Sequence, residues 1–159
     1  MSISDVMWQG ESTDPGRAKE VRVVKPLQFD DDTPRTAGMR RLAAVSGLLV
    51  GSEKLWAGVQ LAEPNTASGV HHHGPLETVV YVAEGRGTLR WGRRLEHQTE
   101  LEAGDFLFVP PFLPHQEINP SPDRPALWIV VRSAPEAVVV ELTAGADGEY
   151  SAADGRGKG

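Results

Sequence analysis

The chain has 159 residues, of which 40% are hydrophobic, so it is long enough to bury a core and too apolar for a disordered protein. Its net charge of −6 gives no support for binding to nucleic acid or to an anionic membrane. It has no cysteine, which excludes disulfides and thiolate metal sites, and no signal peptide or membrane-spanning stretch is apparent. We therefore expect a soluble, cytoplasmic protein.

In chain order, residues 1–20 are polar and weakly patterned, which is typical of a flexible N-terminal arm. A strand is expected from Val21 to Lys25, ended by Pro26, and a loop rich in turn-forming residues follows at 30–36. Further strands are indicated by β-branched or aromatic content, or by alternation, at 43–50, 55–61, 78–82, 87–91, 106–109, 127–131 and 137–142.

These short strands, separated by glycine, proline, asparagine and aspartate, predict an all-β sandwich or jelly roll. No segment has the pattern of a long amphipathic helix, and there is no internal repeat, so we expect one barrel over residues 21–142. Trp56, Trp91 and Trp128 lie in strand-like runs and should fill its core or a subunit interface. The tail at 143–159 is rich in glycine, alanine and aspartate and is expected to be disordered.

Three of the five histidines are consecutive, His71, His72 and His73, and Glu77 follows four residues after the last of them. In a strand, His71 and His73 would point to one face and His72 to the other. Two neutral imidazoles and a carboxylate make a good partial shell for a borderline divalent metal ion. A histidine-rich surface turn would show the same residues, so this cluster alone leaves metal binding open.

A second segment, from Gly104 to Asn119, holds a fourth histidine, His115. With the first cluster it resembles the two signature motifs of the cupin family. The residues that match the first motif are His71, His73, Glu77 and Gly85, and those that match the second are Gly104, Pro110, His115 and Asn119. The specific resemblance covers residues 69–119, and a compatible strand pattern extends it to about 41–133.

The resemblance implies a double-stranded β-helix, or jelly-roll barrel, that binds one divalent ion, which could be iron, zinc, manganese or nickel. The implied ligands are His71, His73, His115 and Glu77, each histidine being held by a hydrogen bond from its second ring nitrogen. Proteins of this family include dioxygenases, isomerases, lyases, polyketide cyclases and binding modules, so fold and ligands do not choose the reaction. We expect an enzyme that oxygenates, isomerises or cyclises a small molecule with a chelating oxygen pair. The alternative is a non-catalytic binding or sensor module.

The chain departs from the family motifs at two positions. Phe112 stands where the second motif usually has glycine, which alters a turn and could place an aromatic ring at the pocket mouth. The spacing that the first motif has before its glycine, applied back from Gly85, puts Thr78 at the position of the carboxylate ligand. The spacing that the motif has after its second histidine, applied forward from His73, favours Glu77. Either a bulge absorbs one residue, or Thr78 faces inward and the site has three histidines plus water. Of the two, we favour Glu77 as the ligand.

A homodimer is expected because a small jelly roll must cover its strand edges. The candidate edges are the segment near Val21, which could add a strand to a partner barrel, and the strand that ends at Leu142. The alternative is that both segments fold back on their own barrel.

Overall fold

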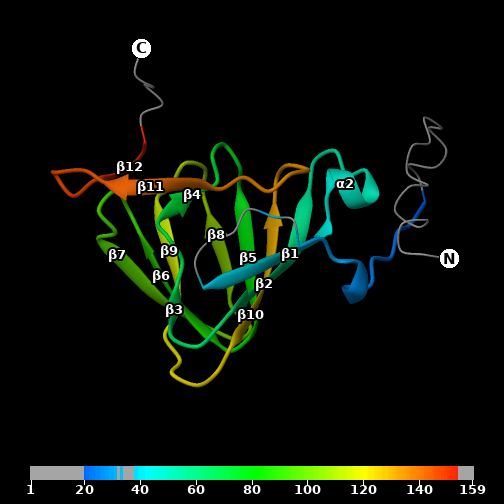
Figure 1. Ribbon diagram of the computed structural model, residues 1–159, viewed down its shortest axis with the longest axis horizontal. Coiled ribbons are helices and arrows are strands. Elements are labelled where there is room, and N and C mark those ends of the chain that lie inside the picture. The colour runs from blue at the N-terminus through cyan, green and yellow to red at the C-terminus, as the bar shows by residue number, and fades with distance from the viewer. Residues whose placement is uncertain (1–19, 32, 34–37, 154–159) are drawn as a thin grey trace, which may run out of the picture.

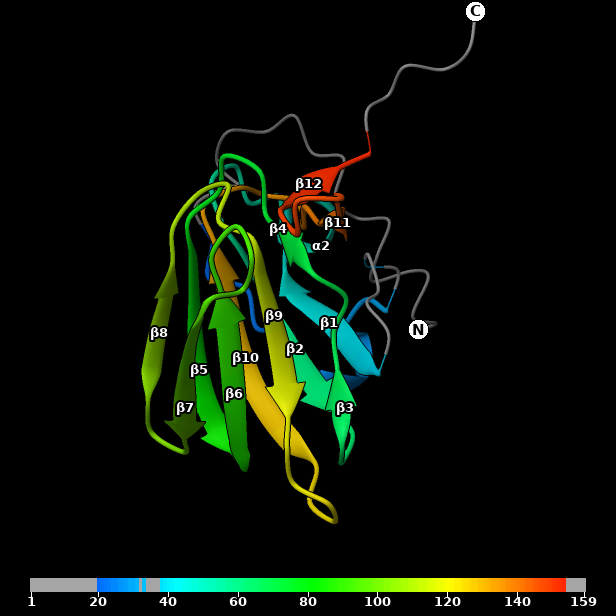
Figure 2. The same cartoon turned by 90° about the vertical axis from the view of Figure 1, so that its left-hand side faces the viewer.

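The computed structural model of the chain describes residues 20–31, 33 and 38–153. Two antiparallel β-sheets face each other and enclose the core (Figure 1; Figure 2). The expectation of an all-β jelly-roll barrel is therefore confirmed. The flexible arm expected at 1–20 lies almost wholly outside the described residues.

One sheet has five strands in the order β1, β2, β10, β5 and β8, with bounds Met39–Val45, Trp56–Ala62, Ala126–Arg132, Thr78–Glu84 and Phe106–Val109. The seven-stranded sheet has the order β12, β11, β4, β9, β6 and β7, with bounds Tyr150–Ala152, Val140–Ala144, His71–His72, His115–Asn119, Arg86–Trp91 and His97–Glu102. Its remaining strand, β3 at Thr66–Ala67, pairs with β9.

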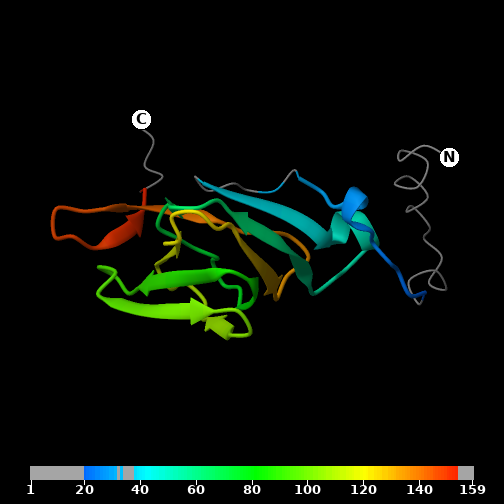
Figure 3. The ribbon, with the colours of Figure 1, turned by 90° about the horizontal axis from the view of Figure 1, so that it is seen from below.

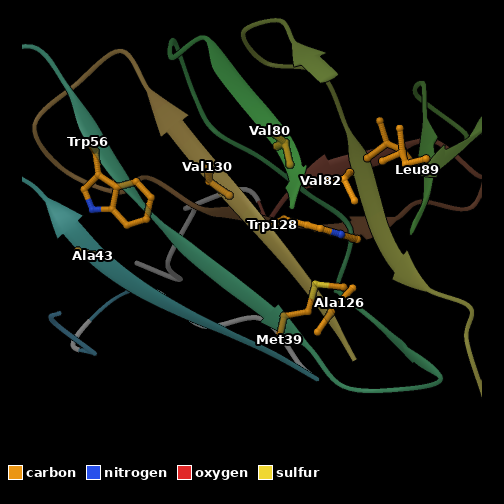
Figure 4. Packing of buried hydrophobic residues seen from close by; sticks show 11 residues of the cluster. Met39, Ala43, Trp56, Val80, Val82, Leu89, Ala126, Trp128 and Val130 are labelled. Atoms are coloured by element: carbon orange, nitrogen blue, oxygen red, sulfur yellow. The ribbon is translucent and has the colours of Figure 1, made fainter. Parts of the chain in front are cut away.

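Strict alternation along the central strands creates the core. In β10 the residues of one parity, from Ala126 through Trp128 and Val130 to Arg132, are buried, while those between them are partly exposed. Trp128 and Val130 pack with Val80 and Val82 of β5 (Figure 4). Trp56 of β2 and Trp128 of β10 are within the core, as the sequence predicts, and Trp91 of β6 is partly buried and packs against it.

Two strand predictions in the first part of the chain are wrong. Residues 21–25 form no strand, and the short 3₁₀ helix η2 begins at Pro26 and ends at Gln28. The strand expected at 43–50 stops at Val45, because the Ser46 hydroxyl accepts a hydrogen bond from the Leu49 amide at 3.1 Å and caps helix α2, Gly47–Val50. Gly51 then ends the helix in the left-handed conformation that glycine adopts without strain.

The boundary drawn at Leu142 is also wrong, because the chain continues as β11 and then β12 instead of a disordered tail from 143. Tyr150 anchors this hairpin: its amide donates to the Arg93 carbonyl at 2.8 Å, and its ring packs on a small cluster with Val70, Leu95 and Leu142. β11 is consequently covered on both sides, by β12 and by β4. Residues 154–159 lie outside the described residues.

The N-terminal segment and the β11–β12 hairpin lie on opposite sides of the body (Figure 1; Figure 3). Within the described residues, no helix has the length and apolar character needed to cross a membrane.

Candidate metal centre

Two paired strands and the turn after one of them bring three histidines together. His71 on β4 lies directly opposite His115 on β9, and His73 follows the end of β4. All three are buried, and each offers a ring nitrogen within 4.8 Å of the others. His72 points to the other face, where its Nδ1 accepts a hydrogen bond from the Gly74 amide at 2.9 Å. The predicted strand parity of the cluster is confirmed.

Backbone carbonyls orient two of the imidazoles. His71 Nδ1 lies 2.9 Å from the Gly69 carbonyl oxygen, and His115 Nδ1 lies 2.9 Å from that of Leu113. A proton on each Nδ1 donates to its carbonyl, which leaves Nε2 with a lone pair for a metal ion. His73 differs, because its Nδ1 is buried and has no hydrogen-bond partner among the described residues. The expected second-nitrogen hydrogen bond is thus present in two of the three histidines.

The remaining nitrogens fit a divalent ion. The Nε2 atoms of His73 and His115 are 3.1 Å apart, and that of His71 is buried without a partner among the described residues. Two nitrogens bound at about 2.0–2.1 Å to one ion are separated by about 3 Å, which agrees with this distance. Burial is the largest cause that lowers the pKa of all three imidazoles, so they are neutral near pH 7, the form that binds metal.

The structure does not bring Glu77 to this cluster. Its side chain is exposed, and its backbone amide donates to the Ser133 hydroxyl at 3.0 Å. Thr78 is buried instead and begins β5 on the inward face. A bulge is present, since the pairing of β10 with β5 skips Ala83. In β5 before this bulge, inward and outward side chains alternate without a break, so Thr78 points inward. The geometry supports three histidines, and not the preferred fourth ligand.

Glu77→Gln should therefore leave the metal content of the protein unchanged. The side chain lies in water outside the cluster, so we also expect the free energy of unfolding to change by about 0.5 kcal/mol or less. Elemental analysis and urea unfolding measure the two quantities. A tenfold or greater loss of metal affinity would contradict this arrangement and restore Glu77 as a ligand.

A buried polar network lies beside the histidines, and residue patterns did not reveal it. Arg41 donates from Nε and Nη2 to Gln60 Oε1 at 3.0 and 2.8 Å, and Gln60 Nε2 donates to Glu117 Oε2 at 2.9 Å. Arg41 Nη2 also lies 4.0 Å from Glu117 Oε2. Burial alone would raise the pKa of the Glu117 carboxyl. The positive charge that His71 carries once it is protonated at low pH, together with the charge of Arg41, outweighs burial and holds that pKa below its usual value.

A second buried arginine, Arg132, lies at the end of β10 and is 1% exposed. Burial lowers its pKa to about 9, with Arg41 adding to the shift and Glu117 opposing it, so the guanidinium is charged near pH 7. Strand alternation could have identified Arg41, Glu117 and Arg132 in the sequence. Each of them lies an even number of residues from a residue of the core or of the histidine cluster on the same strand, and therefore on the same inward face.

Phe112 and His97 lie outside the cluster. Phe112 adopts a left-handed backbone conformation, with φ of 58°, where the family motif has the glycine that tolerates it. Its ring is 61% exposed and meets His72 edge-on at 5.7 Å. The two residues help to line a surface hollow of about 390 Å³ with Tyr150. His97 is exposed and stacks on Trp91 with ring centroids 5.5 Å apart.

Comparison with known proteins agrees with this architecture. The family model described as the cupin domain matches residues 58–132. Gentisate 1,2 dioxygenase 1 of Aquipseudomonas alcaligenes is 32% identical over 87 residues, which are 54% of this chain and 23% of that protein. The chain thus spans less than a quarter of the length of that relative.

Among solved structures, the polyketide cyclase RemF from Streptomyces resistomycificus is similar with a TM-score of 0.62 and 20% identity, over 81% of this chain and 89% of that one. An uncharacterised protein with a double-stranded β-helix domain from Klebsiella pneumoniae gives a TM-score of 0.58 and 20% identity, over 77% and 97% of the two chains. The matched motifs, the two-sheet barrel and these similarities together place the chain in the cupin superfamily.

Proposed function

We propose that this protein is a metal-dependent enzyme that acts on a small, oxygen-rich organic molecule by oxygenation, isomerisation or cyclisation. The observation that carries the proposal is the convergence of three buried imidazoles, a group that no carboxylate joins within the part of the chain that the structure describes. Three protein ligands leave coordination positions open, which is typical of catalytic and not structural metal sites.

The residues divide the work in a way that the geometry supports. His71 and His115, held by backbone carbonyls, and His73 would bind the ion. A divalent ion held by these residues would supply Lewis-acid chemistry toward a carbonyl or enolate oxygen and, if it were iron, reactivity toward dioxygen. Because the imidazoles are neutral, they do not reduce the positive charge at the centre, which favours a substrate that offers two oxygens, at least one of them anionic.

The similarity to a gentisate dioxygenase supports oxygenation of a hydroxylated aromatic acid as the first reaction to examine. The alternative is a non-catalytic module that uses the metal to hold a ligand.

Metal content and oxygen uptake together test the proposal. The full-length protein, as purified, would be analysed for metals and offered gentisate, catechols, diketones and flavonoids in an oxygen electrode, with His115→Ala as the matched control. Iron together with oxygen uptake that His115→Ala abolishes supports an oxygenase. A bound ion with no turnover of any compound, by oxygen uptake or by product analysis, would favour the binding module instead.

We also propose that the protein forms a homodimer through its N-terminal segment. Val21, Val23 and Leu27 are 91%, 69% and 92% exposed, a large apolar content for a segment that extends away from the barrel (Figure 3). A partner barrel would bury these side chains and pair with the segment at a sheet edge.

Light scattering at tens of micromolar should give twice the mass of the 17.2 kDa chain. Removal of residues 1–25 should convert the dimer to a monomer, because that deletion removes Val21 and Val23 together with the backbone that would pair. A wild-type mass near 17.2 kDa would contradict the dimer, and a truncated protein that stays dimeric would place the interface elsewhere.

A further inference from the structure

Three inward-facing side chains form a row across the five-stranded sheet. Arg132 on β10 lies opposite Trp56 on β2 and opposite Thr78 on β5 in the register of the strands. Each of the three side chains is at most 2% exposed. The guanidinium carbon of Arg132 is 5.2 Å from the centroid of the Trp56 ring, so the indole shields one side of the cation.

The side-chain polar atoms of Arg132 and Thr78 have no hydrogen-bond partner among the described residues. These atoms are Nε, Nη1 and Nη2 of Arg132 and Oγ1 of Thr78. A guanidinium carries five N–H donors in a planar fork, and buried polar groups in folded proteins are nearly always paired. Arg41, by contrast, is hydrogen-bonded to Gln60, so the lack of a hydrogen-bond partner distinguishes Arg132 from the other buried arginine.

The balance of charges inside the barrel also indicates that Arg132 lacks an anionic partner. Apart from the histidines, the buried ionisable residues among those described are Arg41, Arg132 and Glu117, two cations and one anion. Glu117 is joined to Arg41 through Gln60, which leaves the charge of Arg132 without a carboxylate in contact. A buried charge without compensation is strongly unfavourable, and a bound anion would remove the imbalance.

Arg132 is also near the histidine cluster. After burial, its charge is the largest cause that lowers the pKa of His73, and it acts on His115 as well. His73 Nδ1, which is buried without a partner among the described residues, adds a further polar atom to the same region. A ligand held by Arg132 would therefore lie close to the metal centre.

We propose that Arg132, supported by Trp56 and by the Thr78 hydroxyl, binds the carboxylate of the substrate, which makes the substrate a small organic acid. A planar guanidinium pairs with a carboxylate through two parallel hydrogen bonds, and its face stacks on an aromatic ring. The placement of a second substrate oxygen at the three histidines rests on the function proposed above. The anion site itself does not require the metal.

Calorimetric titration of the full-length protein, both metal-free and as purified, tests the site. The probes are benzoate and acetate, with benzamide and acetamide as their uncharged counterparts. We expect each acid to bind at least tenfold more tightly than its amide, with or without metal. Arg132→Gln should weaken acid binding at least tenfold, because charge-assisted hydrogen bonds are lost. Arg132→Lys should keep only part of the wild-type affinity for the acids, since an ammonium cannot pair with a carboxylate through two parallel hydrogen bonds.

Arg86→Gln is the matched control, because it removes the same charge from an exposed position at the start of β6 and should leave acid binding unchanged. Arg132→Met supplies a readout that does not depend on ligand. Removing an unpaired buried charge should leave the ligand-free protein at least as thermostable as wild type, and acetate should then fail to raise its Tm.

Acid binding that is equal in wild type and Arg132→Gln, or absent from wild type for both acids, would overturn the inference even if the protein binds metal and is active. If no divalent ion binds but the binding of the acids still depends on Arg132, the anion site is supported and the proposed metal-dependent function is contradicted.

Discussion

His115→Ala should lose most of its divalent metal ion while the barrel stays folded. His115 is fully buried on β9, and its Nε2 lies 3.1 Å from that of His73. Loss of a residue that only orients a ligand typically weakens metal binding about 10–100-fold, so removal of one of three ligands should exceed about 100-fold. Elemental analysis after dialysis measures the occupancy, and circular dichroism reports the fold.

The control is His97→Ala, which removes an imidazole from an exposed position outside the cluster. It should retain the metal content of the wild type. Full occupancy in His115→Ala would show that the three histidines are not the binding site. Loss of metal in both variants would mean that the measurement reports general instability.

Glu117→Gln should lower the free energy of unfolding of the metal-free protein by about 3 kcal/mol. The substitution keeps the size of the side chain but removes the anion that faces Arg41 at 4.0 Å and accepts a hydrogen bond from Gln60. Removal of one partner from a buried charge pair typically costs about 3–5 kcal/mol, because the other charge is left without compensation. Urea unfolding followed by tryptophan fluorescence measures the change.

Glu102→Gln is the comparison for this prediction, because it removes a carboxylate from an exposed position on β7 and should change stability by about 0.5 kcal/mol or less. A double variant, Arg41→Met with Glu117→Leu, should be more stable than the sum of the two single changes implies, since no uncompensated charge remains. Additive losses in that cycle would show that the two charges do not interact.

The strands that could be predicted from sequence are those rich in β-branched and aromatic residues. The expected strands at 55–61, 78–82, 87–91, 106–109 and 127–131 correspond to β2, β5, β6, β8 and β10. β7 and β9 were not among them, because runs such as His97–Glu102 are mostly polar and owe their extended form to pairing with β6. Hydrophobic pattern alone cannot show pairing between strands that are distant in sequence.

The same limit explains what was found and missed at the site. The histidines could be predicted because family spacing and strand parity agree, and His71, His73 and His115 do converge. The inward position of Thr78, with Glu77 outside the cluster, could not be predicted because the choice between them depends on where one bulge falls, and a shift of one residue reverses inside and outside. Arg132 looks like a surface charge at the end of an apolar strand until its cross-strand neighbours Trp56 and Thr78 are known.

The brevity of β4 has a consequence for the metal-free protein. β4 has two residues, yet it joins the β11–β12 hairpin to the rest of its sheet through β9. An ion shared by His71 and His115 would cross-link two segments that are far apart in the chain, and closing such a loop restricts the unfolded ensemble much as a disulfide does. In a chain without cysteine, the ion would be the cross-link that stabilises this end of the barrel. Removal of the ion by a chelator should therefore destabilise β4, β11 and β12 before the five-stranded sheet unfolds.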